Sequence, residues 1–242
     1  MAIYHFSAQV ISRAAGRSAV AAAAYRSASQ LQDQRAERAH DFTAKTGVVH
    51  SEILLPAGAP AALSDRAALW NAVEAAEKRR DAQLAREIEF ALPRELGQAD
   101  AIVLARDFVT RSFVVRGMIA DLNVHWDVGP HGSPKPHAHV MLSLRAVGPA
   151  GFGAKVRAWN AVSELQGWRE GWSAHVNARL AELGIDARID HRTLAAQGVP
   201  LEPQHKIGPA GARRPSGRTS TGRSRCATAR GSWPSRTSRS RR

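Results

Sequence analysis

The chain has 242 residues, of which 44% are hydrophobic, enough for one domain with a substantial core and too few for two large ones. The sequence has no apolar run long enough for a membrane-spanning helix, and its single cysteine excludes an internal disulfide and a thiolate metal cluster, so we expect a cytoplasmic protein. The formal net charge is +13, but the last 30 residues hold ten arginines and no acid, so charge alone is weak evidence for a polyanionic partner.

Hydrophobic periodicity predicts alternating strands and helices along the chain. Residues 2–10 alternate as a strand, and an alanine-rich helix follows with Ser18 as its N-cap. The pattern then predicts a strand over 48–55, a helix capped by Ser64 that runs to about residue 80, a strand over 87–92, a helix over 98–116, strands over 122–127 and 137–144, and a helix over 157–183. Helices between strands, with a late hairpin, indicate an α+β fold with one mostly antiparallel central sheet flanked by helices.

The end of the chain differs in composition from the rest. After about Gly208 it is dominated by Arg, Ser, Gly and Thr, which bury too little apolar surface to offset the entropy of ordering. We therefore expect one folded domain over residues 1–208 and a disordered basic tail over 209–242.

Three histidines in the expected hairpin form the strongest candidate site. His137 and His139 are two residues apart and project from the same face of a strand, and a hairpin centred near position 131 places His125 opposite His137, roughly 5 Å away. Three imidazoles with open coordination positions suit a divalent metal that acts on a phosphate. Mn²⁺ and Mg²⁺ are the candidates, and imidazole ligands favour Mn²⁺. The alternative is that the histidine pair is only a polar strand face.

The two tyrosines of the chain have different surroundings. Tyr4 alternates with apolar residues and is expected in the core. Tyr25 lies on the alanine-rich helix, where small neighbours let its phenol reach beyond the helix to attack a phosphodiester and form a phosphotyrosine. Arg13, Arg17 and Arg26 offer positive charge for phosphates nearby. Core packing is the alternative for Tyr25.

Two carboxylates share one face of the strand expected over 87–92. Glu87 and Glu89 are two residues apart, with apolar residues on the opposite face. One of them could accept the phenol proton or orient a histidine, and Glu89 is the candidate we select. The alternative is a solvated edge face paired with nearby arginines.

Three segments of this sequence resemble a known family. They are IYHFSAQVISRAAGRSAVAAAAYRSAS, REIEFALPREL and DLNVHWDVGPHGSPKPHAHVMLSLR. In this order and spacing they look like the MobA/MobL relaxases, most closely the TraA-like conjugal transfer relaxases of the HUH endonuclease superfamily. The similarity runs from Ile3 to about Pro203.

The resemblance implies a palm-like sheet, a nucleophilic tyrosine at Tyr25 and a metal-binding triad of His125, His137 and His139. It also implies nicking of one DNA strand at a plasmid origin of transfer, with a 5′-phosphotyrosyl intermediate. Accessory relaxosome proteins and a coupling protein are the implied partners.

One difference from the family and three other functions bear on this interpretation. TraA-like proteins usually continue into a helicase region, whereas this chain stops after a short arginine-rich segment, so we expect a truncated or frameshifted product without unwinding activity. A rolling-circle replication initiator of the same superfamily and a non-catalytic DNA-binding remnant stay open as alternatives. Zinc-dependent hydrolysis of a small molecule has weaker support, because no pattern predicts a deep pocket.

Overall fold

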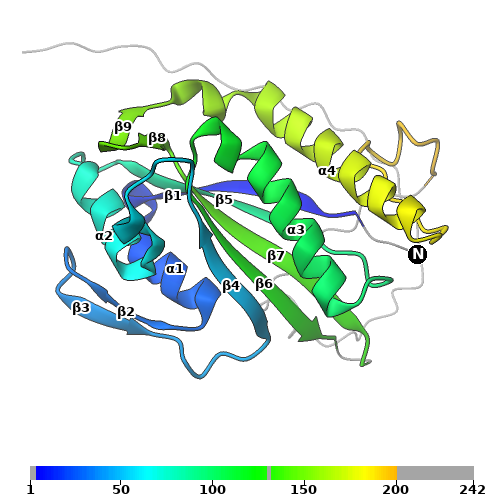
Figure 1. Ribbon diagram of the computed structural model, residues 1–242, viewed down its shortest axis with the longest axis horizontal. Helices are drawn as coiled ribbons and strands as arrows, with labels where there is room; N and C mark the ends of the chain where they lie inside the picture. Colours follow the sequence, from blue (N-terminus) through cyan, green and yellow to red (C-terminus); the bar gives the residue numbers. More distant parts are fainter. Residues whose placement is uncertain (1–3, 130–131, 201–242) are drawn as a thin grey trace, which may run out of the picture.

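A five-stranded antiparallel sheet forms the centre of the computed structural model, which describes residues 4–129 and 132–200 (Figure 1). The strand order is β1-β5-β7-β6-β4, and every pairing is antiparallel. The strands are β1 (Phe6–Ser12), β4 (Val48–Leu54), β5 (Gln83–Ala91), β6 (Ala120–Val128) and β7 (Pro134–Ser143). The expected α+β fold is confirmed.

Helices cover both faces of the sheet. On one face lie α1 (Ala19–Ser27) and α2 (Arg66–Ala76), and on the other lie α3 (Gln98–Ser112) and α4 (Val162–Glu182). Figure 1 shows α3 and α4 side by side. Their face buries an aromatic cluster in which Phe90 of the sheet contacts Phe108 and Trp172. The face under α1 and α2 has a second apolar cluster at one end and polar side chains at the other.

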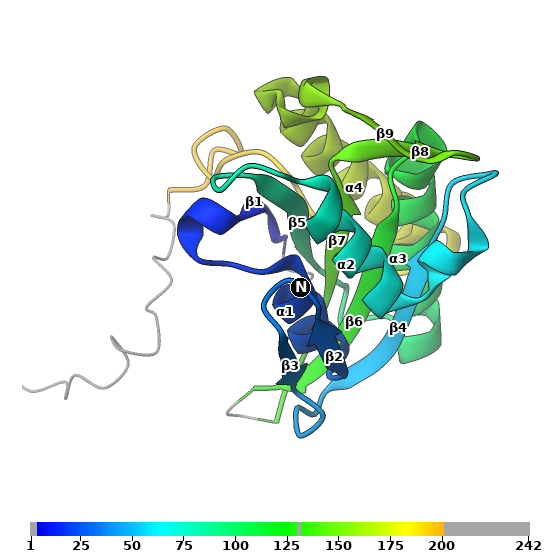
Figure 2. The ribbon, with the colours of Figure 1, turned by 90° about the vertical axis from the view of Figure 1, so that its left-hand side faces the viewer.

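Two short hairpins lie outside the central sheet. They consist of β2 (Gln30–Asp33) with β3 (Arg38–Asp41), and β8 (Arg145–Gly148) with β9 (Gly151–Lys155). Figure 2 shows the first hairpin beside α1. Short 3₁₀ turns complete the fold: η1 (Arg13–Ala15), η2 (Ala61–Ser64), η3 (Val114–Arg116) and η4 (Arg157–Asn160).

Some expected boundaries are wrong for local reasons. The second helix is capped by Asp65, whose side chain accepts a hydrogen bond from Ala68 N, while Ser64 lies in η2. That helix ends at Ala76 rather than near residue 80. The third ends at Ser112, where η3 follows before Gly117 adopts a φ of 91°. Ser18 caps α1 as expected.

The expected tail over 209–242 and the boundary at residue 208 lie outside the described residues. Within residues 4–129 and 132–200, no helix has the length and apolar character needed to cross a bilayer.

Candidate active site

The three histidines meet on the face of the sheet that α1 covers. The β6–β7 register pairs His125 with His137. The ring centroids of His125, His137 and His139 are 4.8–5.1 Å apart, and one nitrogen from each lies within 4.8 Å of the others. The hairpin therefore has the register that the sequence indicated.

Each of these imidazoles has one nitrogen next to a hydrogen-bond acceptor. His125 Nε2 lies 2.7 Å from the carbonyl of Arg26, and His137 Nδ1 lies 2.9 Å from the carbonyl of Lys135. His139 Nδ1 lies 2.9 Å from a buried carboxylate. These acceptors assign an N–H to the facing nitrogen. The opposite nitrogens, Nδ1 of His125 and Nε2 of the other two, then carry lone pairs.

This set of donors fits a divalent metal ion. Three converging imidazole nitrogens, each ring held from behind by an acceptor, form a typical open coordination site. His125 is 2% exposed, and burial lowers its pKa to about 4 despite the Arg26 carbonyl. Burial also lowers the pKa of His137. Both rings are therefore neutral near pH 7, as metal ligands must be.

The carboxylate behind His139 belongs to Glu87, which is 1% exposed. The guanidinium of Arg26 binds both of its oxygens, and Gln9 Nε2 donates to it at 2.7 Å. Burial raises the pKa of Glu87, but hydrogen bonds from His139 and Arg26 outweigh burial and hold the pKa below its usual value. The structure thus provides an ionised carboxylate that orients His139.

Glu89, the carboxylate selected from the sequence, lies opposite His139 in the β5–β7 register. Its carboxylate is 3.5 Å from His5 Nε2 and is 25% exposed. The contact that orients a histidine is therefore made by Glu87, while a role of Glu89 as proton acceptor stays a prediction.

Tyr25 lies in the last turn of α1, and its side chain is partly exposed. The ring of Phe42 packs edge-on against it, with centroids 5.3 Å apart. Lys45 connects it to the histidines, because Lys45 Nζ lies 4.5 Å from the Tyr25 ring centroid and 3.4 Å from His125 Nδ1. The next residue, Arg26, contacts His125 through its carbonyl. The phenol-bearing end of α1 and the triad are thus joined by two separate contacts.

The three arginines selected as phosphate ligands differ in their surroundings. Arg13 forms an ion pair with Glu74 at 2.6 Å and is only 7% exposed, so its charge points into the protein. Arg26 is occupied by its buried pair with Glu87. Arg17 stays partly exposed, with its guanidinium 3.1 Å from Gln9 Oε1.

Sequence reasoning missed Lys45 altogether. It lies between β3 and β4, in a segment without periodicity. No pattern in the sequence indicates that this loop returns to the histidines.

Known proteins share this sequence and fold. A family model described as the MobA/MobL family matches residues 17–215. The conjugal transfer protein TraA of Rhizobium radiobacter is 39% identical over 239 residues, which cover 86% of this chain and 21% of that protein. The mobilization protein MobL of Acidithiobacillus ferridurans is 40% identical over 242 residues, which cover 88% of this chain and 63% of that protein. This chain spans about a fifth of the length of the TraA relatives.

Solved structures extend the comparison. The structure reported under "Molecular Basis of Vancomycin Resistance Transfer in Staphylococcus aureus" is 35% identical, with a TM-score of 0.73, and the match covers 79% of this chain and all of that one. The relaxase TrwC complexed with a 27-mer DNA comprising the recognition hairpin and the cleavage site is 12% identical, with a TM-score of 0.54 over 90% of this chain and 92% of that one. The TrwC match shows a shared fold.

Proposed function

The chain belongs to the MobA/MobL family, and from this premise we propose that it is a metal-dependent relaxase that nicks one DNA strand at a plasmid origin of transfer. The observation that carries the proposal is the convergence of His125, His137 and His139 beside the end of α1 that bears Tyr25. Family membership favours mobilisation over replication initiation. A bare DNA-binding remnant would not need three imidazoles held in this way.

The proposed step is a transesterification. Tyr25 Oη forms a bond to the scissile phosphorus, and the bond from phosphorus to the 3′ oxygen breaks. The phenol gives up its proton, and the leaving 3′ oxygen gains one. The products are a 5′-phosphotyrosyl strand and a free 3′-OH. The reverse step rejoins the strand.

Each residue of the site has a proposed task in this step. His125, His137 and His139 would hold a divalent ion, which supplies positive charge to the phosphate oxygens. The donor set favours Mn²⁺ over Mg²⁺ because Mg²⁺ prefers oxygen ligands. Glu87 fixes the ring of His139, and Lys45 holds the Tyr25 ring through a cation–π contact. Glu89 is proposed as the proton acceptor.

The two tyrosines of the chain provide a direct test. Single-stranded oligonucleotides that tile candidate origins of transfer, labelled at the 3′ end, are incubated with the protein and Mn²⁺ or Mg²⁺. We expect a labelled adduct that survives denaturing electrophoresis for the wild type and for Tyr4→Phe, and none for Tyr25→Phe. Tyr4 is a matched control because it lies away from the triad, with its hydroxyl donating to the carbonyl of Arg169.

The same assay separates the residue roles. Glu89→Gln should slow adduct formation by about 10²–10⁴-fold if Glu89 accepts the proton. An adduct formed by Tyr25→Phe would overturn the assignment of the nucleophile. DNA binding without any cut by the wild type, at every tiled site and with either metal, would favour the remnant.

A further inference from the structure

A hollow of about 270 Å³ lies at the N-terminal end of α1, away from the Tyr25 end. Its walls come from the segment before α1, the β2–β3 turn and the loop before β5. Five arginines line it: Arg13, Arg17, Arg35, Arg38 and Arg80. We call this hollow the basic groove.

Three of the five arginines that line the basic groove are not paired with a carboxylate in the described part of the chain. Arg35, Arg38 and Arg80 are exposed, and none of them forms an ion pair with another residue in the described part of the chain. Asp33 also lines the groove but is 1% exposed. Its oxygens accept hydrogen bonds from Ser18 Oγ at 2.6 Å and from the backbone N–H of Ala36 at 2.9 Å. The groove therefore presents three exposed guanidinium groups to solvent.

Arg17 connects the basic groove to the histidine site. It lines the groove, and its guanidinium lies 3.7 Å from Glu87, the carboxylate behind His139. The nine residues of α1 extend about 13 Å between the groove and the turn that carries Tyr25. At roughly 3.4 Å per nucleotide of a helical strand, about four nucleotides cover this distance.

We propose that the basic groove binds the phosphates of the single strand on one side of the cleavage point. This inference rests on the proposed function and adds where the DNA strand would lie, along α1 from Tyr25 to the basic groove. Guanidinium groups bind phosphate oxygens bidentately. Aromatic and amide side chains, which stack on or read bases, are absent from the described residues that line the groove. Contacts to phosphates carry no sequence information, so the groove would supply affinity for the strand.

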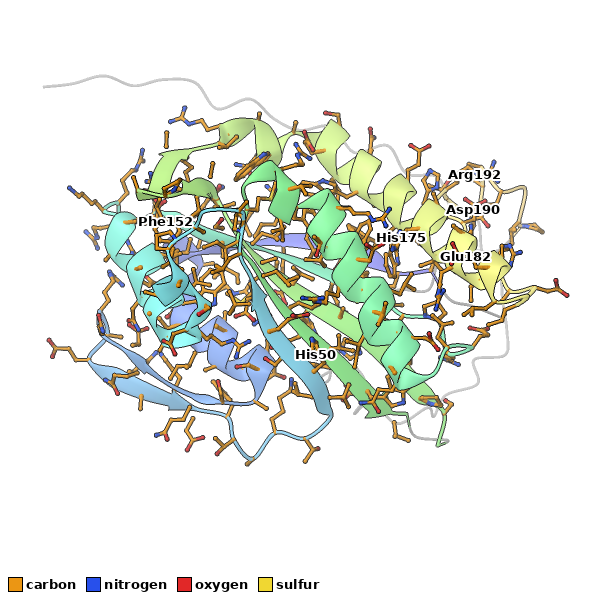
Figure 3. The ribbon with its side chains drawn as sticks, viewed as in Figure 1. His50, Phe152, His175, Glu182, Asp190 and Arg192 are labelled. Carbon is orange, nitrogen blue, oxygen red and sulfur yellow. The ribbon has the colours of Figure 1, made fainter. Side chains whose placement is uncertain are left out.

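A second hollow provides a matched control. It measures about 590 Å³, lies between α3 and α4 on the other side of the sheet, and contains Arg106, Arg111 and Arg179. Each of these arginines is paired with a carboxylate, from Glu52 at 3.2 Å, Asp107 at 2.8 Å and Asp100 at 3.0 Å, respectively. Figure 3 labels His175 and Glu182 at this hollow.

The test measures binding of a fluorescein-labelled oligothymidylate to the full chain by anisotropy, between about 50 and 200 mM salt. The test variant is Arg35→Gln/Arg38→Gln/Arg80→Gln, and the control is Arg106→Gln/Arg111→Gln/Arg179→Gln. Loss of three phosphate contacts should lower the slope of log K against log salt by about 2 and weaken binding roughly 100-fold at ~0.1 M salt. The control should keep the wild-type slope. Residues 209–242 contribute equally to both variants.

The outcomes separate this inference from the proposed function. Arg35→Lys/Arg38→Lys/Arg80→Lys should restore most of the slope, which excludes misfolding as the cause. An unchanged slope in the glutamine variant, or an equal loss in the control, overturns the role of the groove even when the wild type nicks DNA. A groove-dependent slope in a protein that forms no tyrosine adduct supports the groove and contradicts the proposed function.

Discussion

Lys45 occupies an unusual place for a cation, beside the nitrogen of His125 that would face a metal ion. Unit and double positive charges about 4 Å apart repel by several kcal/mol at the effective dielectric of a protein surface. A metal ion held at His125 Nδ1 would therefore repel the Lys45 ammonium. The Lys45 ammonium is also 4.5 Å from the centroid of the Tyr25 ring.

Replacing Lys45 tests this competition without any cleavage assay. Lys45→Met should bind Mn²⁺ at least about tenfold more tightly than the wild type, because about 1.4 kcal/mol of repulsion accounts for a factor of ten. Calorimetric titration of the metal-free protein measures the change. Lys78→Met, which removes an exposed lysine of the α2–β5 loop, should leave the affinity unchanged. Weaker Mn²⁺ binding by Lys45→Met would contradict the competition.

Among the residues of the candidate site, the sequence predicts those that follow the alternation of a strand and does not predict those that lie in loops. The histidine positions follow from strand alternation and one hairpin centre. The partner of His139 is harder to predict, because Glu87 and Glu89 share a face and only packing against Arg26 decides between them. Lys45 depends on the path of a loop, which no local pattern encodes.

Lys45 lies in the loop that leads into β4, and the backbone conformation of this loop determines its position. Gly47 has a φ of 90°, and its carbonyl accepts a hydrogen bond from Trp126 N at 2.7 Å. A Cβ at this position would overlap Asp127 Oδ1. This loop therefore needs glycine for its backbone conformation and for the close approach to β6.

Gly47→Ala is expected to destabilise the fold by roughly 1–2 kcal/mol, because a φ of 90° is strained for alanine, while the half-exposed Asp127 carboxylate can rotate out of the way. Gly184→Ala is the matched control. Gly184 has a φ of 69°, but an added Cβ meets nothing within 4 Å, so only strain of about 1 kcal/mol applies. Urea unfolding of both variants gives the comparison. A much larger loss in Gly47→Ala than in Gly184→Ala would contradict this expectation and show that the Asp127 side chain cannot move aside.

The elements that sequence patterns predicted are the long ones with a buried face. The strands of β2–β3 and β8–β9 were missed because each is only four or five residues long, too short for a run of alternating apolar and polar residues. The start of α2 was misplaced by one residue because Ser64 and Asp65 are both good caps. Which of them acts depends on the 3₁₀ turn before the helix.

At the scale of the whole molecule, the aromatic core and the candidate active site lie on opposite faces of the central sheet. Phe108 is 3% exposed on α3 and contacts Phe90, Phe113 and Trp172, all on the face away from the histidines. The opposite face carries the triad and the basic groove. Damage to the aromatic cluster should therefore leave the site intact while the protein stays folded.

Phe108→Leu tests this separation more gently than truncation to alanine, because leucine keeps part of the apolar volume. It should lower the free energy of unfolding by about 1–3 kcal/mol through lost contacts and imperfect packing. The metal affinity, measured by titration well below the unfolding temperature, should match that of the wild type. A fall in both would show that the two faces are coupled through the sheet.

Arg26 has a mechanical consequence for Tyr25, the proposed nucleophile. Its guanidinium is bound to Glu87 of β5 and its carbonyl to His125 of β6, so the residue next to Tyr25 is clamped to two strands at once. Movement of the backbone at this end of α1 away from the imidazoles would break the contact between the Arg26 carbonyl and His125. The position of the Tyr25 hydroxyl is then set mainly by rotation about the side-chain torsions of Tyr25. A DNA strand would therefore have to bind where this hydroxyl can reach its phosphate.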